Sequence, residues 1–133
     1  MATLEQTLLR SALPKRDAAA LPNAERLERP RRDFHWPGAR LVFRAIGETM
    51  IEAGIADGDL VFVRPTKDLR TAAGKIIVCE LGDATYVKQL ELVAGRLRLL
   101  SRNPRFAPID VDEEADRFEL IGIVVGRSGS PAL

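Results

Sequence analysis

Residues 75–92 read KIIVCELGDATYVKQLEL, and this stretch carries the clearest secondary-structure signal in the chain. Lys75–Leu81 and Ala84–Leu92 are β-type runs, and Gly82-Asp83 between them is a turn pair typical of a hairpin. The stretch therefore predicts two antiparallel strands joined by a tight turn.

Further short β-type runs lie on both sides of this hairpin. They are Leu41–Ile46, Leu60–Arg64, Arg96–Leu100 and Phe118–Val125. Only Met50–Ile55 resembles a helical turn. Six short strands with tight turns predict a small mainly-β domain, built of short twisted sheets or a partial barrel.

The first 40 residues differ in composition from the rest of the chain. Four of the 8 prolines fall there, and proline disrupts long helices and interior strands. Thr3 and Gln6 have the spacing of a capping box, which predicts a short helix over about residues 3–12 and an extended arm after it. We therefore predict an N-terminal arm at 1–40, a domain at 41–128 and a C-terminal tail at 129–133.

The composition excludes several classes of protein. With 1 Cys and 1 His, the chain can form neither an intramolecular disulfide nor a Cys/His zinc site, and no cofactor or metal is expected. A net charge of +1 gives no general case for nucleic-acid binding. No apolar run approaches membrane-spanning length and no secretory signal is visible, so we expect a cytoplasmic protein without membrane contact.

Lys88 lies on the wrong face of its predicted strand. Because side chains alternate along a strand, Lys88 shares a face with Tyr86, Leu90 and Leu92, which is the more apolar of the two faces. Burial disfavours a charged ammonium and lowers its pKa, which suits a lysine to act as a general base. The alternative is a lysine that extends its ammonium to the sheet edge.

Thr49 lies between a predicted strand and the predicted helical turn. Gly47 permits a tight bend there, and a hydroxyl on such a bend, ahead of free backbone N–H groups, is suited to nucleophilic attack. The alternative is that Thr49 simply caps the helical turn.

Five ordered blocks of sequence resemble one family. They are FRAIGETM at 43–50, GIADGDL at 54–60, YVK at 86–88, NPRFAPI at 103–109 and GIVVG at 122–126. Over about 84 of 133 residues, they resemble the C-terminal domain of LexA-type repressors and the polymerase accessory protein UmuD, which are self-cleaving Ser-Lys peptidases. The resemblance implies the mainly-β fold of that family and a homodimer formed through this domain.

The resemblance also implies site residues. Lys88 falls at the general-base position, Thr49 at the position of the nucleophilic serine, and the Met50 backbone in the oxyanion-hole region. Thr49 and Lys88 are then expected within about 2.6–3.5 Å of each other. The substrate is expected to be the chain's own N-terminal arm, and a DNA-binding domain is not expected, because proline-broken residues cannot supply a helix-turn-helix.

Two departures from the family pattern leave two functions open. Threonine replaces serine, and its β-methyl crowds the site. The arm also lacks the family's Ala-Gly or Cys-Gly cleavage dipeptide, which leaves the small-residue run at 18–21 as the candidate substrate. The first hypothesis is an autopeptidase of the Ser/Thr-Lys type linked to SOS or phage-type regulation. The second is a catalytically impaired dimer that docks a polymerase or a regulator.

Three other features are given structural interpretations. Cys79 is expected to be a small buried hydrophobe. Asp57 and Asp59 are explained by the turn around Gly58, and the acidic run Asp110–Asp116 by a solvated loop.

Overall fold

The computed structural model describes residues 23–26 and 37–128, and most of these residues lie in strands. In chain order the strands are β1 (Ala24–Arg26), β2 (Leu41–Ala45), β3 (Leu60–Pro65), β4 (Ile76–Leu81), β5 (Ala84–Val93), β6 (Arg96–Leu100), β7 (Ile109–Val111) and β8 (Phe118–Arg127). Two short helices, the 3₁₀ turn η3 (Ile51–Ala53) and α1 (Leu69–Ala72), interrupt them. The predicted mainly-β fold class is confirmed, whereas the predicted helix over 3–12 lies outside the described residues.

The strands form one antiparallel sheet in the order β1-β2-β3-β8-β4-β5-β6-β7. The central hairpin forms as its sequence predicts, with Cys79 opposite Tyr86 and Leu81 opposite Ala84 at the turn. β8 lies between β3 and β4, and its nearly continuous apolar sequence reflects packing on both faces, with Ile123 in one apolar cluster and Val124 against another.

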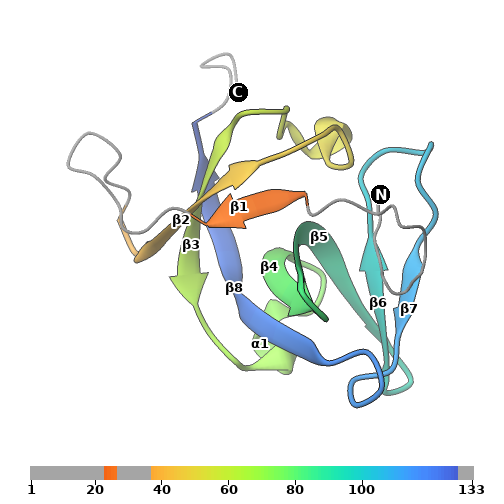
Figure 1. The fold of residues 1–133 in the computed structure, drawn as a ribbon. Helices are drawn as coiled ribbons and strands as arrows, with labels where there is room; N and C mark the ends of the chain where they lie inside the picture. Colours follow the sequence, from red (N-terminus) through yellow and green to blue (C-terminus); the bar gives the residue numbers. More distant parts are fainter. Residues whose placement is uncertain (1–22, 27–36, 129–133) are drawn as a thin grey trace.

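The sheet curls until its first strand approaches β5 (Figure 1). The backbone N–H of Asn23, directly before β1, donates to the carbonyl of Thr85 in β5 at 3.1 Å. The carbonyl of Asn23 accepts from the N–H of Ile46 at 3.0 Å, just after β2. Residues of the predicted arm therefore join β2 to β5, which the order of strands in the sheet places far apart.

The curled sheet encloses apolar clusters on both faces of β5. Tyr86 and Leu90 pack into one cluster with residues of β4, β6 and β8, and Val87 packs into another with Phe43 and Met50. Because the middle of β5 is covered on both sides, the three consecutive residues Tyr86, Val87 and Lys88 are all buried.

Three elements were missing from the sequence expectations. β1 and β7 have only three residues each, and their pairing with β2 and β6 is a tertiary contact that no local pattern encodes. α1 is a single turn, and the carboxylate of Asp68 caps it by accepting from the N–H of Arg70 at 3.0 Å. The run Asp110–Asp116, expected as a loop throughout, begins inside β7.

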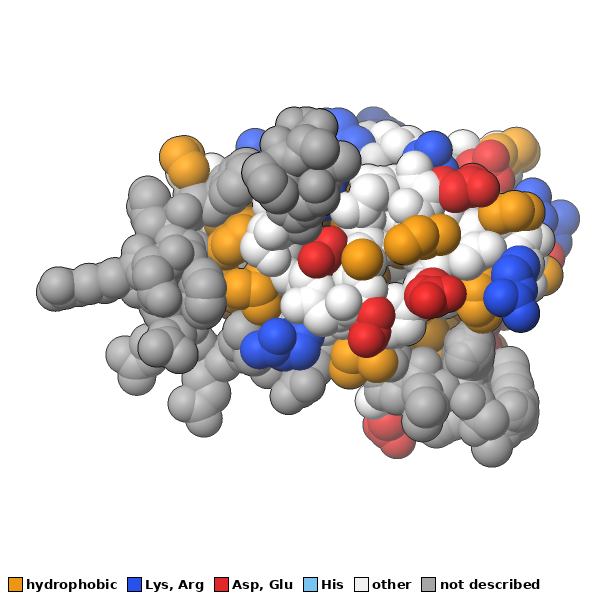
Figure 2. Space-filling model, turned by 90° about the horizontal axis from the view of Figure 1, so that it is seen from above, with side chains coloured by type: hydrophobic (Ala, Val, Ile, Leu, Met, Phe, Trp, Pro, Cys, Tyr) orange, Lys and Arg blue, Asp and Glu red, His pale blue; other side chains and the backbone are white. Residues whose placement is uncertain are grey.

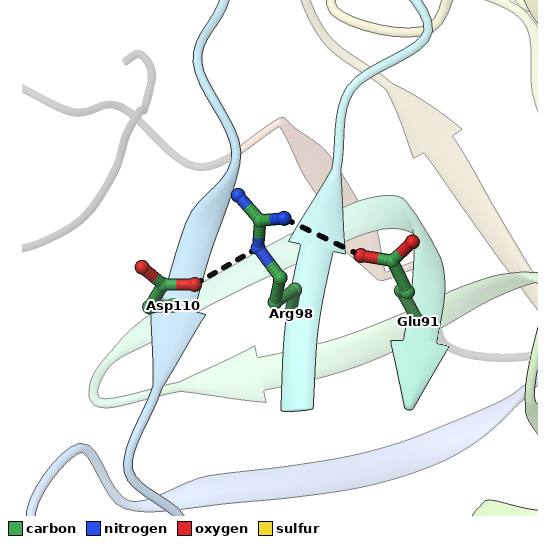
Figure 3. A network of polar contacts seen from close by, with 3 residues as sticks. All are labelled: Glu91, Arg98 and Asp110. Atoms are coloured by element: carbon green, nitrogen blue, oxygen red, sulfur yellow. Dashed lines mark hydrogen bonds and ion pairs between the residues drawn. The ribbon is translucent and has the colours of Figure 1, made fainter. Parts of the chain in front are cut away.

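A row of charges crosses the far edge of the sheet (Figure 3). Glu91, Arg98 and Asp110 are register partners on β5, β6 and β7. Nε of Arg98 donates to Asp110 at 2.9 Å, and its Nη1 lies 3.6 Å from a Glu91 carboxylate oxygen. Opposite charges placed directly across neighbouring strands stabilise the pairing modestly, and here they hold the three-residue β7 against β6.

Candidate active site

Lys88 lies inside the protein, with 2% of its surface exposed. Its Nζ atom is 2.8 Å from Oγ of Ser101 and 5.5 Å from the centre of the Tyr86 ring. An aromatic ring attracts a nearby cation, by about 2 kcal/mol when the pair is withdrawn from water, whereas burial by itself disfavours the charged ammonium. Lys88 is therefore buried, and its ammonium does not extend to solvent at the sheet edge as the alternative interpretation expected.

Thr49 lies on a bend that other side chains hold in place. Gly47 has a φ of 87°, and its N–H donates to the carboxylate of Asp57 at 2.7 Å. A left-handed backbone is readily adopted by glycine, and the Asp57 contact ties this bend to the following turn. Asp59 accepts in the same way from the N–H of Ala56 at 2.8 Å. Both aspartates therefore have the turn-forming role that the sequence suggested.

The Thr49 hydroxyl does not cap the helical turn. η3 begins after Met50, with no side-chain hydrogen bond at its cap. Instead, Oγ1 of Thr49 accepts a hydrogen bond of 2.6 Å from Nδ2 of Asn23, and the residue is 6% exposed. The hydroxyl is thus held toward the interior, and its partner comes from the predicted arm.

Asn23 connects the Thr49 bend with the strand of Lys88. Its Nδ2 also donates to the carbonyl of Val87 at 3.0 Å, and its Oδ1 accepts from the Val87 N–H at 2.7 Å. Val87 directly precedes Lys88 in β5, so one side chain contacts both the threonine and the backbone beside the lysine.

The segment after β6 makes a second connection between the same two regions. Ser101 contacts Lys88, and the carbonyl of Arg102 accepts from the N–H of Glu52 at 2.8 Å. Nδ2 of Asn103 donates to the carbonyl of Glu48, the residue before Thr49, at 2.8 Å. The bend with Thr49 and the side chain of Lys88 are therefore bracketed by contacts from two sides.

Met50 anchors the residue after the bend. Its side chain is buried beside Val87, and its carbonyl accepts from the N–H groups of Ala53 and Ile55 at 3.0 and 3.2 Å. Within residues 23–26 and 37–128 the N–H of Met50 meets no hydrogen-bond acceptor. A backbone donor left over in this way can serve a developing oxyanion.

Sequence analysis did not identify three contributors to this site. Asn103 belongs to the family block at 103–109, but no role was predicted for it, and only the Asn-Pro pair that it begins drew attention to this position. Ser101 and Asn23 carried no local signal, because their partners lie 13 and 26 residues away. Only the pairing of β5 with β6, and the closure of the sheet by the arm, bring them to the site.

The face of the molecule seen from above in Figure 1 carries mixed charge. In Figure 2, acidic and hydrophobic side chains intermingle across the middle of the face, and basic side chains lie toward its margins. The described residues of this face therefore form no continuous positively charged patch of the kind that binds a phosphate backbone. A pocket of about 320 Å³ lies elsewhere, between η3 and the ends of β4 and β8, and neither Thr49 nor Lys88 lines it.

Taken together, these features describe a small mainly-β domain in which Asn23 contacts both the Thr49 hydroxyl and the backbone of Val87, the residue before the buried Lys88. The family model described as "Peptidase S24-like" matches residues 15–125. The chain belongs to this peptidase family, and the resemblance to LexA-type domains is confirmed.

Named relatives agree with this assignment. The chain is 43% identical over 90 residues to the LexA repressor of Dechloromonas aromatica, a match covering 68% of the chain and 44% of that relative. It is 38% identical over 93 residues to LexA repressor 1 of Pseudomonas syringae pv. tomato, covering 70% and 45% of the two chains. The chain thus spans less than half the length of these relatives. Among the described residues, no helix is long and apolar enough to cross a membrane.

Proposed function

We propose that this chain is an endopeptidase of the Ser/Thr-Lys type that cleaves its own N-terminal arm. In this proposal Thr49 is the nucleophile, Lys88 the general base and the Met50 N–H an oxyanion donor. The observation that carries it is the 2.6 Å contact between Asn23 and the Thr49 hydroxyl, because it brings the arm itself to the nucleophile.

The reach of the chain supports cleavage within the arm. The run at 18–21 lies two to five residues before Asn23. An extended chain covers about 3.3–3.6 Å per residue, so these residues are tethered within about 7–18 Å of Asn23. Such a tether raises the effective concentration of the scissile bond at the site.

The proposed reaction proceeds through an ester on Thr49. Oγ1 of Thr49 attacks the scissile carbonyl carbon while its proton passes to the neutral amine of Lys88. The Met50 N–H donates to the oxyanion, and the protonated Lys88 then gives the proton to the leaving amine as the C–N bond breaks. Water hydrolyses the ester with Lys88 again as base, which restores the Thr49 hydroxyl.

The burial of Lys88 supports its role as the base. A lysine withdrawn from water gives up its proton more readily, because the charged form loses its hydration. Its hydrogen bond to Ser101 also restricts where Nζ can lie. Both features are those expected of a lysine that must be neutral and fixed in position.

We further propose that the protein acts as a homodimer in SOS or phage-type regulation. The relatives named LexA repressor support this setting. Light scattering at high micromolar concentration should give twice the mass of 14.7 kDa. A monomer at that concentration would contradict the dimer without affecting the proposed chemistry.

A second candidate is a regulatory or polymerase-accessory module that has lost cleavage. The buried position of Thr49 and its β-methyl, which both restrict access of a substrate to the hydroxyl, favour this second function. The decisive experiment incubates the purified full chain at increasing pH and measures its intact mass. A cut in the arm that accelerates with pH and is absent in Lys88→Ala supports the peptidase, and an unchanged mass at every pH supports the binding module.

A further inference from the structure

Asn23 makes more hydrogen bonds than a linker residue needs. Its side chain donates to Thr49 and to the Val87 carbonyl and accepts from the Val87 N–H. Its backbone N–H and carbonyl are also paired, with Thr85 and Ile46. With 3% of its surface exposed, Asn23 is a buried polar residue whose amide group is fully used.

The hydrogen bonds made at position 23 require a side chain that both donates and accepts, as an amide does. β6 pairs with β5 only from Gln89 onward, so near Val87 one edge of β5 is left without a partner strand. The side-chain amide of Asn23 meets both the N–H and the carbonyl of Val87, as the peptide group of an added strand would. The second amide hydrogen remains for Thr49, and a carboxylate of the same size could supply neither donation.

We propose that Asn23 is a positioning residue for the Thr49 nucleophile. A hydroxyl has one hydrogen and two acceptor lone pairs. Because Asn23 donates to one lone pair, the hydroxyl hydrogen points away from Asn23 and is available to Lys88. The arm thus orients the nucleophile only while it is seated against β5. This inference rests on the proposed function, since it assigns Asn23 a part in the same reaction.

The test compares Asn23→Asp and Asn23→Ala with the unaltered full chain across pH. In Asn23→Asp the carboxylate accepts the Thr49 proton instead of directing it to Lys88, and its negative charge favours the ammonium form of the lysine. The rate of self-cleavage should fall at least about tenfold, because misplacing a reacting group slows a reaction by this much or more. The pH at which the rate rises should also increase, because the lysine then loses its proton at higher pH. Asn23→Ala should slow self-cleavage by a similar factor but should leave the pH profile of the rate unshifted, because alanine adds no charge.

Asn103 supplies the matched control. It is also buried and also holds the bend, but through the carbonyl of Glu48 and not through the hydroxyl. Asn103→Asp should lower stability and rate while leaving the pH profile where it is. Amide exchange at Val87 reports seating of the arm separately, and it should accelerate in Asn23→Ala and stay slow in Asn23→Asp, whose carboxylate still accepts from Val87.

The outcomes separate this inference from the proposed function. If the unaltered chain and Lys88→Ala are equally inert, the proposed function fails and the role of Asn23 falls with it. If the unaltered chain cleaves itself and both Asn23 variants keep its rate and pH profile, only the role of Asn23 is overturned. A faster Asn23→Ala variant also overturns it, because the contact would then restrain the nucleophile.

Discussion

Nζ of Lys88 lies 2.8 Å from Oγ of Ser101, and the segment that begins at Ser101 also holds the bend carrying Thr49. One short connection after β6 therefore positions both the buried amine and the bend of the hydroxyl.

The first prediction concerns that contact. Ser101→Ala removes one hydrogen bond from the lysine, a change of about 0.5–1.5 kcal/mol, so self-cleavage should slow by about 2- to 10-fold. Ser101→Thr keeps the hydroxyl and should retain more of the rate. Time courses of intact mass provide the measurement, and equal rates for the two variants would argue against a role for Ser101.

Lys88 itself provides the second prediction. Lys88→Ala should abolish cleavage at every pH, and in the unaltered chain the rate should rise with pH as the neutral amine becomes populated. Two titratable groups among the described residues interact with it: Tyr86, whose ring centre is 5.5 Å from Nζ, and Cys79 on β4. Cleavage that survives Lys88→Ala would exclude the Ser/Thr-Lys mechanism.

The third prediction separates the nucleophile from the substrate. If the β-methyl of Thr49 limits the reaction, Thr49→Ser should increase the rate several-fold, because serine rotates more freely. If the arm sequence is limiting, Thr49→Ser alone should change little, and an Ala-Gly dipeptide introduced between residues 11 and 20 should be needed as well. Mass spectrometry of both single variants and the double variant identifies the cause, and any cut should map before Asn23.

The fourth prediction concerns Cys79, which is fully buried on β4. Burial raises the pKa of its thiol from 9.0 to about 12, against a smaller lowering by the charge of Lys88. The unfolded chain therefore releases the thiol proton at a lower pH than the folded chain does. Between pH 9 and 12 the thiol should reduce the free energy of unfolding by up to about 1.4 kcal/mol per pH unit.

Cys79→Ala is the control for this effect. Subtracting its stability profile from that of the unaltered chain isolates the thiol from other groups that titrate at high pH. The folded protein should also resist thiol alkylation at pH 8 until denaturant is added. Rapid alkylation of the folded chain would contradict the buried position. Cleavage assays are accordingly best kept below about pH 9, where this destabilisation begins.

The fifth prediction tests the packing of the central strand. A Cβ at Gly122 of β8 would lie 2.6 Å from Cγ1 of Val63 and still closer to the carbonyl oxygen of Arg64, both on β3. Because backbone atoms cannot move aside cheaply, Gly122→Ala should destabilise the fold by about 1–3 kcal/mol or more. Gly95→Asn is the matched control, since Gly95 has open space and asparagine tolerates its left-handed backbone. Denaturant unfolding of the two variants gives the comparison, and equal losses would refute the close approach.

The amino-acid pattern alone was enough to predict every strand except β1 and β7, and to single out Thr49 and Lys88 as candidate site residues. Alternation along Ala84–Leu92 indicated that Lys88 faces the apolar side, because the side chains of any strand point alternately to its two faces. The turn residues Gly82-Asp83 fixed the register of the hairpin in the same local way. The ordered blocks indicated the family, which the matches to known proteins confirmed.

The surroundings of Thr49 and Lys88, in contrast, depend on contacts between residues far apart in the chain. Asn23 reaches Thr49 across 26 residues, and Ser101 reaches Lys88 only because β6 folds back along β5. β1 and β7 are too short to be stable alone and exist because a neighbouring strand offers unpaired N–H and carbonyl groups. Local patterns specify which way a side chain points, whereas the partner that it meets depends on how distant strands pair when the sheet closes.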